Sequence, residues 1–153
     1  MADYDIHIED HSADVMRIFH NQLEVALNAV GTQAVSHAKQ VITDAKVYGG
    51  VDLKAKGEKD NSRVDMGSLR KSIAHTVRGN NVYIGTNLDY APYHELGTGI
   101  YASQAGGRQT PWIYTDRDGV VHQTKGLYPI HFLKKAASEH TDEYKAIMER
   151  IMG

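Results

Sequence analysis

Apolar residues recur at helical spacing over a long first segment, from Ser12 to about Lys46. They fall within one stripe roughly 100° wide on a helix. The stripe consists of Val15, Phe19, Leu23, Ala26, Val30, Ala34 and Val41. Ser12 can serve as the N-cap, and Gly49-Gly50 supplies a stop. Such a helix would be about 50 Å long, more than a domain of this size covers from one side, so we expect part of the stripe to contact another subunit.

Two β-hairpins are predicted in the middle and later parts of the chain. The runs "IAHTV" from Ile73 and "VYIGT" from Val82 are rich in strand-forming residues and are joined by "RGNN", which suits a tight turn. A second hairpin is predicted in "PWIYTDRDGVVHQT", where "DRDG" separates two strand-like runs.

The last segment predicts one helix from about Pro129, because proline fits a first helical turn. One face of this helix carries Leu133, Ala137, His140, Tyr144, Ile147, Met148 and Ile151. A long N-terminal helix, a small antiparallel β-sheet with short helices and a C-terminal helix together predict an α+β fold. At 153 residues, we expect one domain spanning residues 1–153.

Two polar, glycine-rich segments, residues 49–63 and 97–109, are predicted to be mobile loops. The first carries basic residues that could contact DNA or an acidic partner. Acidic residues are interleaved with them, which favours a solvated loop. The basic residues are Lys54, Lys56, Lys59 and Arg63, and the acidic ones are Asp52, Glu58 and Asp60.

Charge and composition narrow the function classes. The formal net charge is −2, so no overall positive field holds nucleic acid by its phosphates. The chain has no cysteine, which removes disulfides and thiol chemistry and suits a reducing compartment. The N-terminus is acidic and lacks an apolar run, so we expect neither a signal peptide nor a membrane span.

The stretch "YAPYHELGTG", Tyr90 to Gly99, looks most like a site because it places His94 beside Glu95. Asp89 as N-cap, Pro92 in the first turn and Gly97 as the C-terminal glycine predict a two-turn helix from Tyr90 to Leu96. Neighbouring residues on a helix point about 100° apart, so this pair would be a poor acid and base. We expect no catalysis here.

Nine histidines raise the question of a metal site. His7 and His11 precede the predicted cap and have no third ligand nearby. His37 and His140 lie within the apolar stripes of the first and last helices, where we expect hydrogen-bonded core or interface residues. "DRDG" resembles the start of a calcium loop, but Leu127 stands where the bidentate glutamate would be. The sequence therefore predicts no metal and no cofactor.

Three ordered segments resemble the head-tail joining proteins of tailed bacteriophages, small neck or tail-completion proteins often described as minor capsid or minor tail components. The segments are "VDMGSLRKSI" from Val64, "YAPYHELGTG" from Tyr90 and "TKGLYPIHFLKKA" from Thr124. Each motif alone is weak, but the ordered set covers most of the chain. The chain departs from the family pattern at Met66, at His94 and in "FLKKA", which lacks the usual proline.

The resemblance implies a non-catalytic virion protein at the head-tail junction, made in the bacterial cytoplasm. Its partners would be copies of itself in a hexameric or dodecameric ring, and neighbouring neck proteins such as an adaptor or head-closure protein and a tail terminator or tail tube. We expect no specific nucleic-acid binding. The alternatives are a small phosphodiesterase or hydrolase using His94 and Glu95, and a nucleic-acid-binding module using the lysine-rich loop.

Within this resemblance, the candidate interface or motif residues receive roles. Asp65 and Gly67 would shape a turn before a short helix that Leu69 and Ile73 pack, and Phe132 and Leu133 would anchor the final helix. Arg70 and Glu95 are candidates for an ion pair within or between subunits. The motif residues Tyr90, Tyr93, Gly97 and Thr98 complete the set.

Overall fold

The computed structural model of the chain describes residues 9–48, 62–115 and 119–153. Its first element, α1 (Ser12–Tyr48), is a single helix of 37 residues, which confirms the prediction from the apolar stripe. The side chain that caps the start of α1 is that of Asp10 and not that of Ser12, as was predicted. Oδ1 of Asp10 accepts the backbone N–H of Ser12 at 2.9 Å. This hydrogen bond lowers the pKa of Asp10, since it favours the charged carboxylate.

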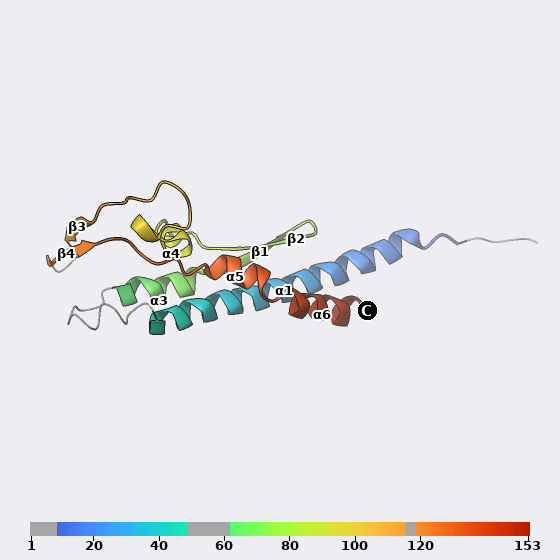
Figure 1. The fold of residues 1–153 in the computed structure, drawn as a ribbon. Coiled ribbons are helices and arrows are strands. Elements are labelled where there is room, and N and C mark those ends of the chain that lie inside the picture. The colour runs from blue at the N-terminus through green and yellow to red at the C-terminus, as the bar shows by residue number, and fades with distance from the viewer. Residues whose placement is uncertain (1–8, 49–61, 116–118) are drawn as a thin grey trace, which may run out of the picture.

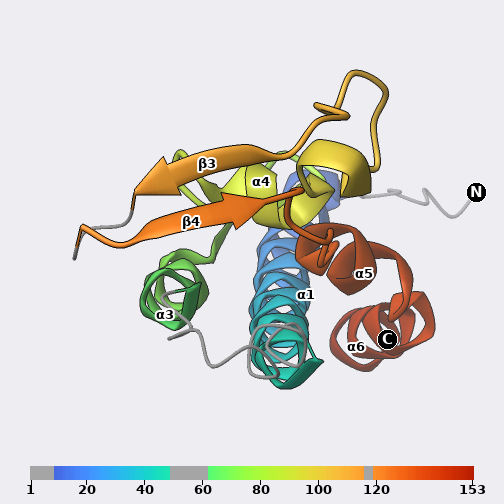
Figure 2. The same ribbon diagram turned by 60° about the vertical axis from the view of Figure 1, so that its left-hand side comes forward.

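Helix α1 is the axis on which most other elements pack (Figure 1). Helix α3 (Ser62–Ser72), strands β1 (Ala74–Arg78) and β2 (Asn81–Gly85), and two C-terminal helices all contact it. Viewed along α1, α3 lies on one side and the C-terminal helices lie on the other (Figure 2). The first turns of α1 extend beyond all of these neighbours (Figure 1).

Both predicted hairpins are confirmed, and they form two separate two-stranded antiparallel sheets. Strands β1 and β2 pair from Ala74 opposite Gly85 to Arg78 opposite Asn81, and Gly79 takes the positive φ of 58° that the tight turn requires. Strands β3 (Trp112–Thr115) and β4 (Val121–Thr124) form the second hairpin, which lies away from α1 in both views (Figures 1 and 2).

The prediction of one C-terminal helix from Pro129 is wrong. The structure has α5 (Phe132–Ser138) and α6 (Thr141–Met152), separated by a break at which His140 adopts φ −123° and ψ 24°. The hydroxyl of Tyr144 donates across the break to the carbonyl of Ala136, which satisfies an acceptor in the last turn of α5. The break allows both short helices to pack against α1.

The core lies where α1, α3, α4 and α5 meet. Phe132, Ile42 and Leu69 are its largest fully buried side chains. Small residues of α1 face the buried side chains of the other helices, so these helices pack close to the α1 backbone. The buried cluster consists of Ala38, Ile42, Met66, Leu69, Ile73, Ala91, Phe132 and Ala136.

Parts of the two segments predicted to be mobile loops are helical in the structure, and their mobility stays a prediction. Residues 49–61 lie outside the described ranges, and Ser62 and Arg63 already belong to α3. The segment 97–109 contains a 3₁₀ helix, η1 (Gly99–Tyr101), and its first half is held by backbone hydrogen bonds to residues 125–127.

The substitution Phe132→Ala should lower the free energy of unfolding by about 3–5 kcal/mol, because it removes a fully buried aromatic ring and leaves a cavity. Urea denaturation measures the change.

Ile42→Ala and Ile113→Ala make a matched pair, since Ile42 is fully buried and Ile113 is 68% exposed. We expect Ile42→Ala to cost about 2–5 kcal/mol and Ile113→Ala under about 0.5 kcal/mol; equal costs would contradict this core.

Candidate functional site

The segment that looked most like a site is a short helix, α4 (Ala91–Leu96), with Pro92 in its first turn as predicted. The predicted cap is not formed: Tyr90, not Asp89, is the N-cap residue, and no side chain caps the helix. The backbone N–H of Ala91 donates instead to the carbonyl of Leu88 at 3.1 Å. A backbone turn therefore begins α4.

Glu95 caps a different helix from the one that carries it. Its Oε2 accepts the backbone N–H of Leu133 at 2.9 Å, and its Oε1 accepts that of Lys134 at 3.0 Å. These are N–H groups of the first turn of α5, which have no partner within the helix. His131, the N-cap residue of α5, has a left-handed backbone with φ 56° and makes no side-chain cap. Glu95 supplies the missing acceptor together with a negative charge at the positive end of the helix.

The end of α4 is capped in return by the segment that leads into α5. The carbonyl of His94 accepts the N–H of Ile130 at 2.8 Å, and the carbonyl of Glu95 accepts that of His131 at 3.2 Å. The carbonyl of Leu96 accepts the N–H of Ser103 at 2.8 Å. The two helices thus satisfy each other's terminal groups, and we call this arrangement the α4–α5 corner.

Gly97, Thr98 and Gly99 bring two of the resemblance segments together. Gly97, the C-cap residue of α4, has a positive φ of 74°, and a Cβ there would lie 2.8 Å from the carbonyl oxygen of Leu127. Thr98 binds Leu127 twice, because its N–H donates to the Leu127 carbonyl and its Oγ1 accepts the Leu127 N–H, both at 2.9 Å. A Cβ at Gly99 would overlap the carbonyl oxygen of Lys125. The Gly-Thr-Gly sequence therefore lets the backbone of residues 97–99 lie close to the backbone of residues 125–127.

The aromatic residues of this segment differ in exposure. The rings of Tyr90 and His94 meet edge to face with centroids 5.8 Å apart, which confirms that they share one face of the helix. Tyr90 packs against the core, whereas Tyr93 is 57% exposed. Both Glu95 oxygens are used in capping α5, so the adjacent His94 and Glu95 do not form an acid and base pair directed at a common point.

The first resemblance segment lies in α3, and its predicted turn is wrong. Gly67 is inside the helix without a positive φ, and a Cβ there would meet no atom within 4 Å. Asp65 also lies in this helix, and its side chain is outside the described part of the chain. Leu69 and Ile73 are buried in the core as predicted, Phe132 is fully buried, and Leu133 packs beside it.

The predicted ion pair between Arg70 and Glu95 does not form within the chain. Nη1 of Arg70 donates to Oγ1 of Thr43 on α1 at 3.2 Å, and the Glu95 carboxylate faces α5. Within the chain, two backbone N–H groups that no charge pattern marks hold the carboxylate. An ion pair between subunits stays a prediction.

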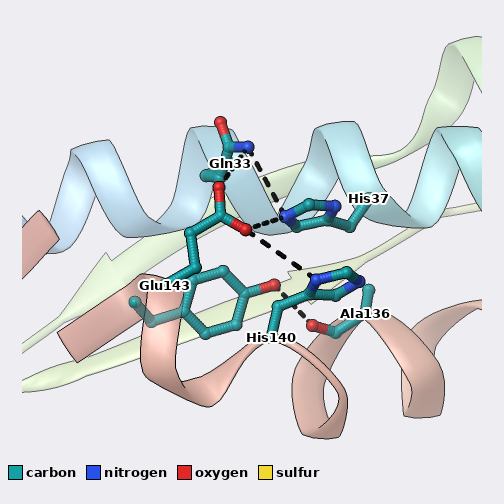
Figure 3. A network of polar contacts seen from close by, with 6 residues as sticks. Gln33, His37, Ala136, His140 and Glu143 are labelled. Carbon is teal, nitrogen blue, oxygen red and sulfur yellow. Dashed lines mark hydrogen bonds and ion pairs between the residues drawn. The ribbon is translucent and has the colours of Figure 1, made fainter. Parts of the chain in front are cut away.

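A second group of polar side chains joins α1 to α6 (Figure 3). Nε2 of His37 lies 2.7 Å from Oε2 of Glu143, and Gln33 donates to Oε1 of the same carboxylate at 2.8 Å. The rings of His37 and His140 stack in parallel, with centroids 3.5 Å apart and an angle of 2° between their planes. Nδ1 of His140 is 3.8 Å from Oε2 of Glu143. We call His37, His140 and Glu143 the histidine cluster.

The histidine cluster was only partly predicted. His37 and His140 were expected in the helix stripes, and His37 is half-buried and hydrogen-bonded. Glu143 and Gln33 were missed, although each stands one helical turn from a histidine of the pair. Beside the cluster, burial and the neighbouring Glu143 charge raise the pKa of Tyr144, whose hydroxyl donates to the carbonyl of Ala136.

The projecting end of α1 exposes large apolar side chains. Val15 is 61% exposed, Ile18 56% and Phe19 47%. By helical geometry these three lie within about 100° of one another; Val15 and Phe19 are in line with buried Ala26, and Ile18 is in line with Val25, which is 60% exposed. Among the described residues, no helix is both long and apolar enough to span a membrane.

An apolar groove of about 420 Å³ lies between α1 and α6, further along the same helix. Leu27 and Val30 of α1 form one wall, and Tyr144 and Met148 of α6 form the other. Lys145 and Glu149 are the charged residues at this groove. The chain thus presents an apolar helix end and an apolar groove at two different places.

The substitution Glu95→Ala should destabilise the fold by about 1–2 kcal/mol in urea denaturation, because two N–H groups of α5 lose their acceptor. Glu95→Gln should cost less, since one amide oxygen can still accept. Glu24→Ala, at an exposed position within α1, is the control and should change stability little. Equal effects at Glu24 and Glu95 would show that the cap contributes nothing.

Alanine at two glycines should have opposite effects. Gly97→Ala should destabilise by roughly 1 kcal/mol or more, because the residue has a positive φ and its Cβ would press on the Leu127 carbonyl. Gly67→Ala should stabilise by roughly 0.5–1 kcal/mol, because it removes a glycine from a helix where space is open. Thermal unfolding of both variants checks the sign of each change, and a neutral Gly97→Ala would refute the close approach of the two backbone segments.

Comparisons of the chain with protein-family models, with curated proteins and with solved structures find no match.

Proposed function

We propose that this chain is a non-catalytic structural protein of the bacteriophage neck, a ring component that joins the portal side of the head to the tail. The proposal starts from the ordered resemblance of three sequence segments to head-tail joining proteins. Two of those segments, 90–99 and 124–136, meet in the α4–α5 corner, where their polar groups bind each other. The residues of these two segments therefore hold the chain in its fold, as the residues of a shared family motif would.

The observation that carries the proposal is the exposed apolar end of α1. Val15, Ile18 and Phe19 are exposed apolar side chains on the first turns of α1, and these turns extend past the other elements that pack on the helix (Figure 1). Val15 and Phe19 are in line with buried Ala26. Exposed apolar side chains that lie side by side are typical of surfaces that another protein covers. A subunit of a larger assembly needs such a surface, whereas an isolated monomer is not stabilised by one.

A second copy of the chain is the occupant that the geometry favours. A cyclic ring uses head-to-tail contacts, so each subunit must present two different and complementary surfaces. The projecting helix end supplies an apolar ridge, and the groove between α1 and α6 supplies an apolar recess lined by Leu27, Val30 and Met148. We place the ridge of one copy in the groove of the next.

The remaining features of the proposal follow from the resemblance and the charge. The ring would be a hexamer or dodecamer in the virion, in contact with an adaptor or head-closure protein and with the tail terminator or tail tube. A formal net charge of −2 suits a subunit that lies beside DNA without gripping its phosphates.

Light scattering coupled to size exclusion, followed by negative-stain imaging, tests the proposal on the untagged protein. We expect concentration-dependent assembly into closed rings. Ile18→Ser should raise the dissociation constant of assembly roughly tenfold or more, because an apolar side chain loses its buried site. Ile113→Ser is the matched control, since Ile113 is similarly exposed at 68% but lies on β3, away from α1.

Two results would contradict the proposal. A chain that stays monomeric at millimolar concentration, alone and with the other neck proteins of its phage, would exclude the ring. Equal weakening by the two isoleucine substitutions would exclude the end of α1 as the contact. In the phage itself, deletion of the protein should leave heads and tails unjoined in electron micrographs, and normal infectious virions would refute the neck role.

A further inference from the structure

The histidine cluster brings together three side chains that bind transition metals well. Two imidazoles and one carboxylate are common ligands of Zn²⁺ in proteins. The ligand atoms of His37, His140 and Glu143 all lie within 4.8 Å of one another. With Zn–N and Zn–O bonds near 2.1 Å, tetrahedral ligand atoms are about 3.4 Å apart. The separations of 2.7 Å and 3.8 Å that the two histidines make with Oε2 of Glu143 lie on either side of this value.

From these contacts we propose that His37, His140 and Glu143 form a binding site for a divalent transition-metal ion of the Zn²⁺ class. The ligands would be Nε2 of His37, Nδ1 of His140 and Oε2 of Glu143, and water would complete the coordination. The site would join α1 to the first turn of α6 across the break that follows α5. It goes beyond the neck role and does not depend on ring formation.

One neighbouring residue orients the carboxylate of the cluster. Gln33, one helical turn before His37, donates to Oε1 of Glu143 at 2.8 Å. This bond fixes the carboxylate so that Oε2 faces the two rings (Figure 3). A second hydrogen bond that orients a ligating carboxylate is a regular feature of protein metal sites. Gln33 therefore acts as a positioning residue.

Metal binding requires one change in the cluster. An ion lies close to the plane of each imidazole that binds it, and two parallel rings 3.5 Å apart share no such position. One ring must therefore turn. His140 is the residue that can do so, because it lies at the break between α5 and α6 and its torsion about the ring bond is broad. The His37 ring is held by the 2.7 Å hydrogen bond of its Nε2 with Oε2 of Glu143 and stays in place.

Access and proton balance also suit an ion. The side chains of His37, His140 and Glu143 are 19%, 32% and 42% exposed, so an ion can reach all three from solvent. The hydrogen shared between Nε2 of His37 and Oε2 of Glu143 would leave this position when the ion takes its place, and it would move to Nδ1 of the same ring if the imidazole is neutral or to solvent if it is charged. Binding would then replace a hydrogen-bonded contact with two coordinate bonds.

Thermal unfolding of the untagged, chelator-treated protein with added Zn²⁺ tests the site, with Mg²⁺ as the negative control ion. At a free Zn²⁺ concentration about one hundredfold above the dissociation constant, the melting temperature should rise by roughly 5–10 °C. Glu143→Gln, which keeps the size of the side chain, and His140→Ala, at the helix break, should each abolish most of the rise. His20→Ala is the matched control, because His20 is an exposed histidine of α1 outside the cluster and should leave the rise unchanged.

Cobalt substitution gives a second readout that a purely structural role would not change. Co²⁺ in the wild-type protein and in His20→Ala should give the strong visible absorption of a low-coordinate site, and Glu143→Gln and His140→Ala should lose it. Absence of a Zn²⁺ response in the wild type would overturn the proposal. A response of equal size in all four proteins would also overturn it, because the ion would then be bound by other histidines.

Discussion

The α4–α5 corner is the interaction that fixes where α5 begins and how it meets α1. The carboxylate of Glu95 binds the first N–H groups of α5, and the segment before α5 binds the last carbonyls of α4. A left-handed backbone at His131 turns the chain into α5 at this point, so that Phe132 enters the core beside α1. Without the corner, the first N–H groups of α5 would have no acceptor and the direction of α5 would not be fixed. The ring of Phe132 would then not be held in the core.

The elements that could be predicted were those that local pattern decides. The helix predicted from the apolar stripe and the tight turn of the first hairpin are local properties, and both are confirmed. The break before α6 was missed because His140 and Tyr144 stay in phase with the apolar face of α5, so periodicity continues across it. The turn predicted at Gly67 is wrong for the opposite reason, because here a local signal was present but was misleading. A glycine does not by itself make a turn, and Gly67 lies within α3.

The candidate site was harder to predict because its contacts join residues far apart in the chain. Glu95 looked like half of an acid and base pair, yet its partners are backbone groups at Leu133 and Lys134, which no side-chain pattern marks. His37 and Glu143 meet only because α6 packs along α1. The same packing leaves the first turns of α1 uncovered, so one long helix serves both the core of the subunit and its proposed contact with a neighbour.

Amide hydrogen exchange at Leu133 and Lys134, followed by NMR, tests the central role of the corner most directly. We expect both amides to exchange slowly in the wild-type protein, as amides within a helix do, because Glu95 holds them. In Glu95→Ala both should exchange faster by an order of magnitude or more, while amides near the end of α6 keep their wild-type rates. Fast exchange of these two amides in the wild type, or no change on substitution, would contradict this role of the corner.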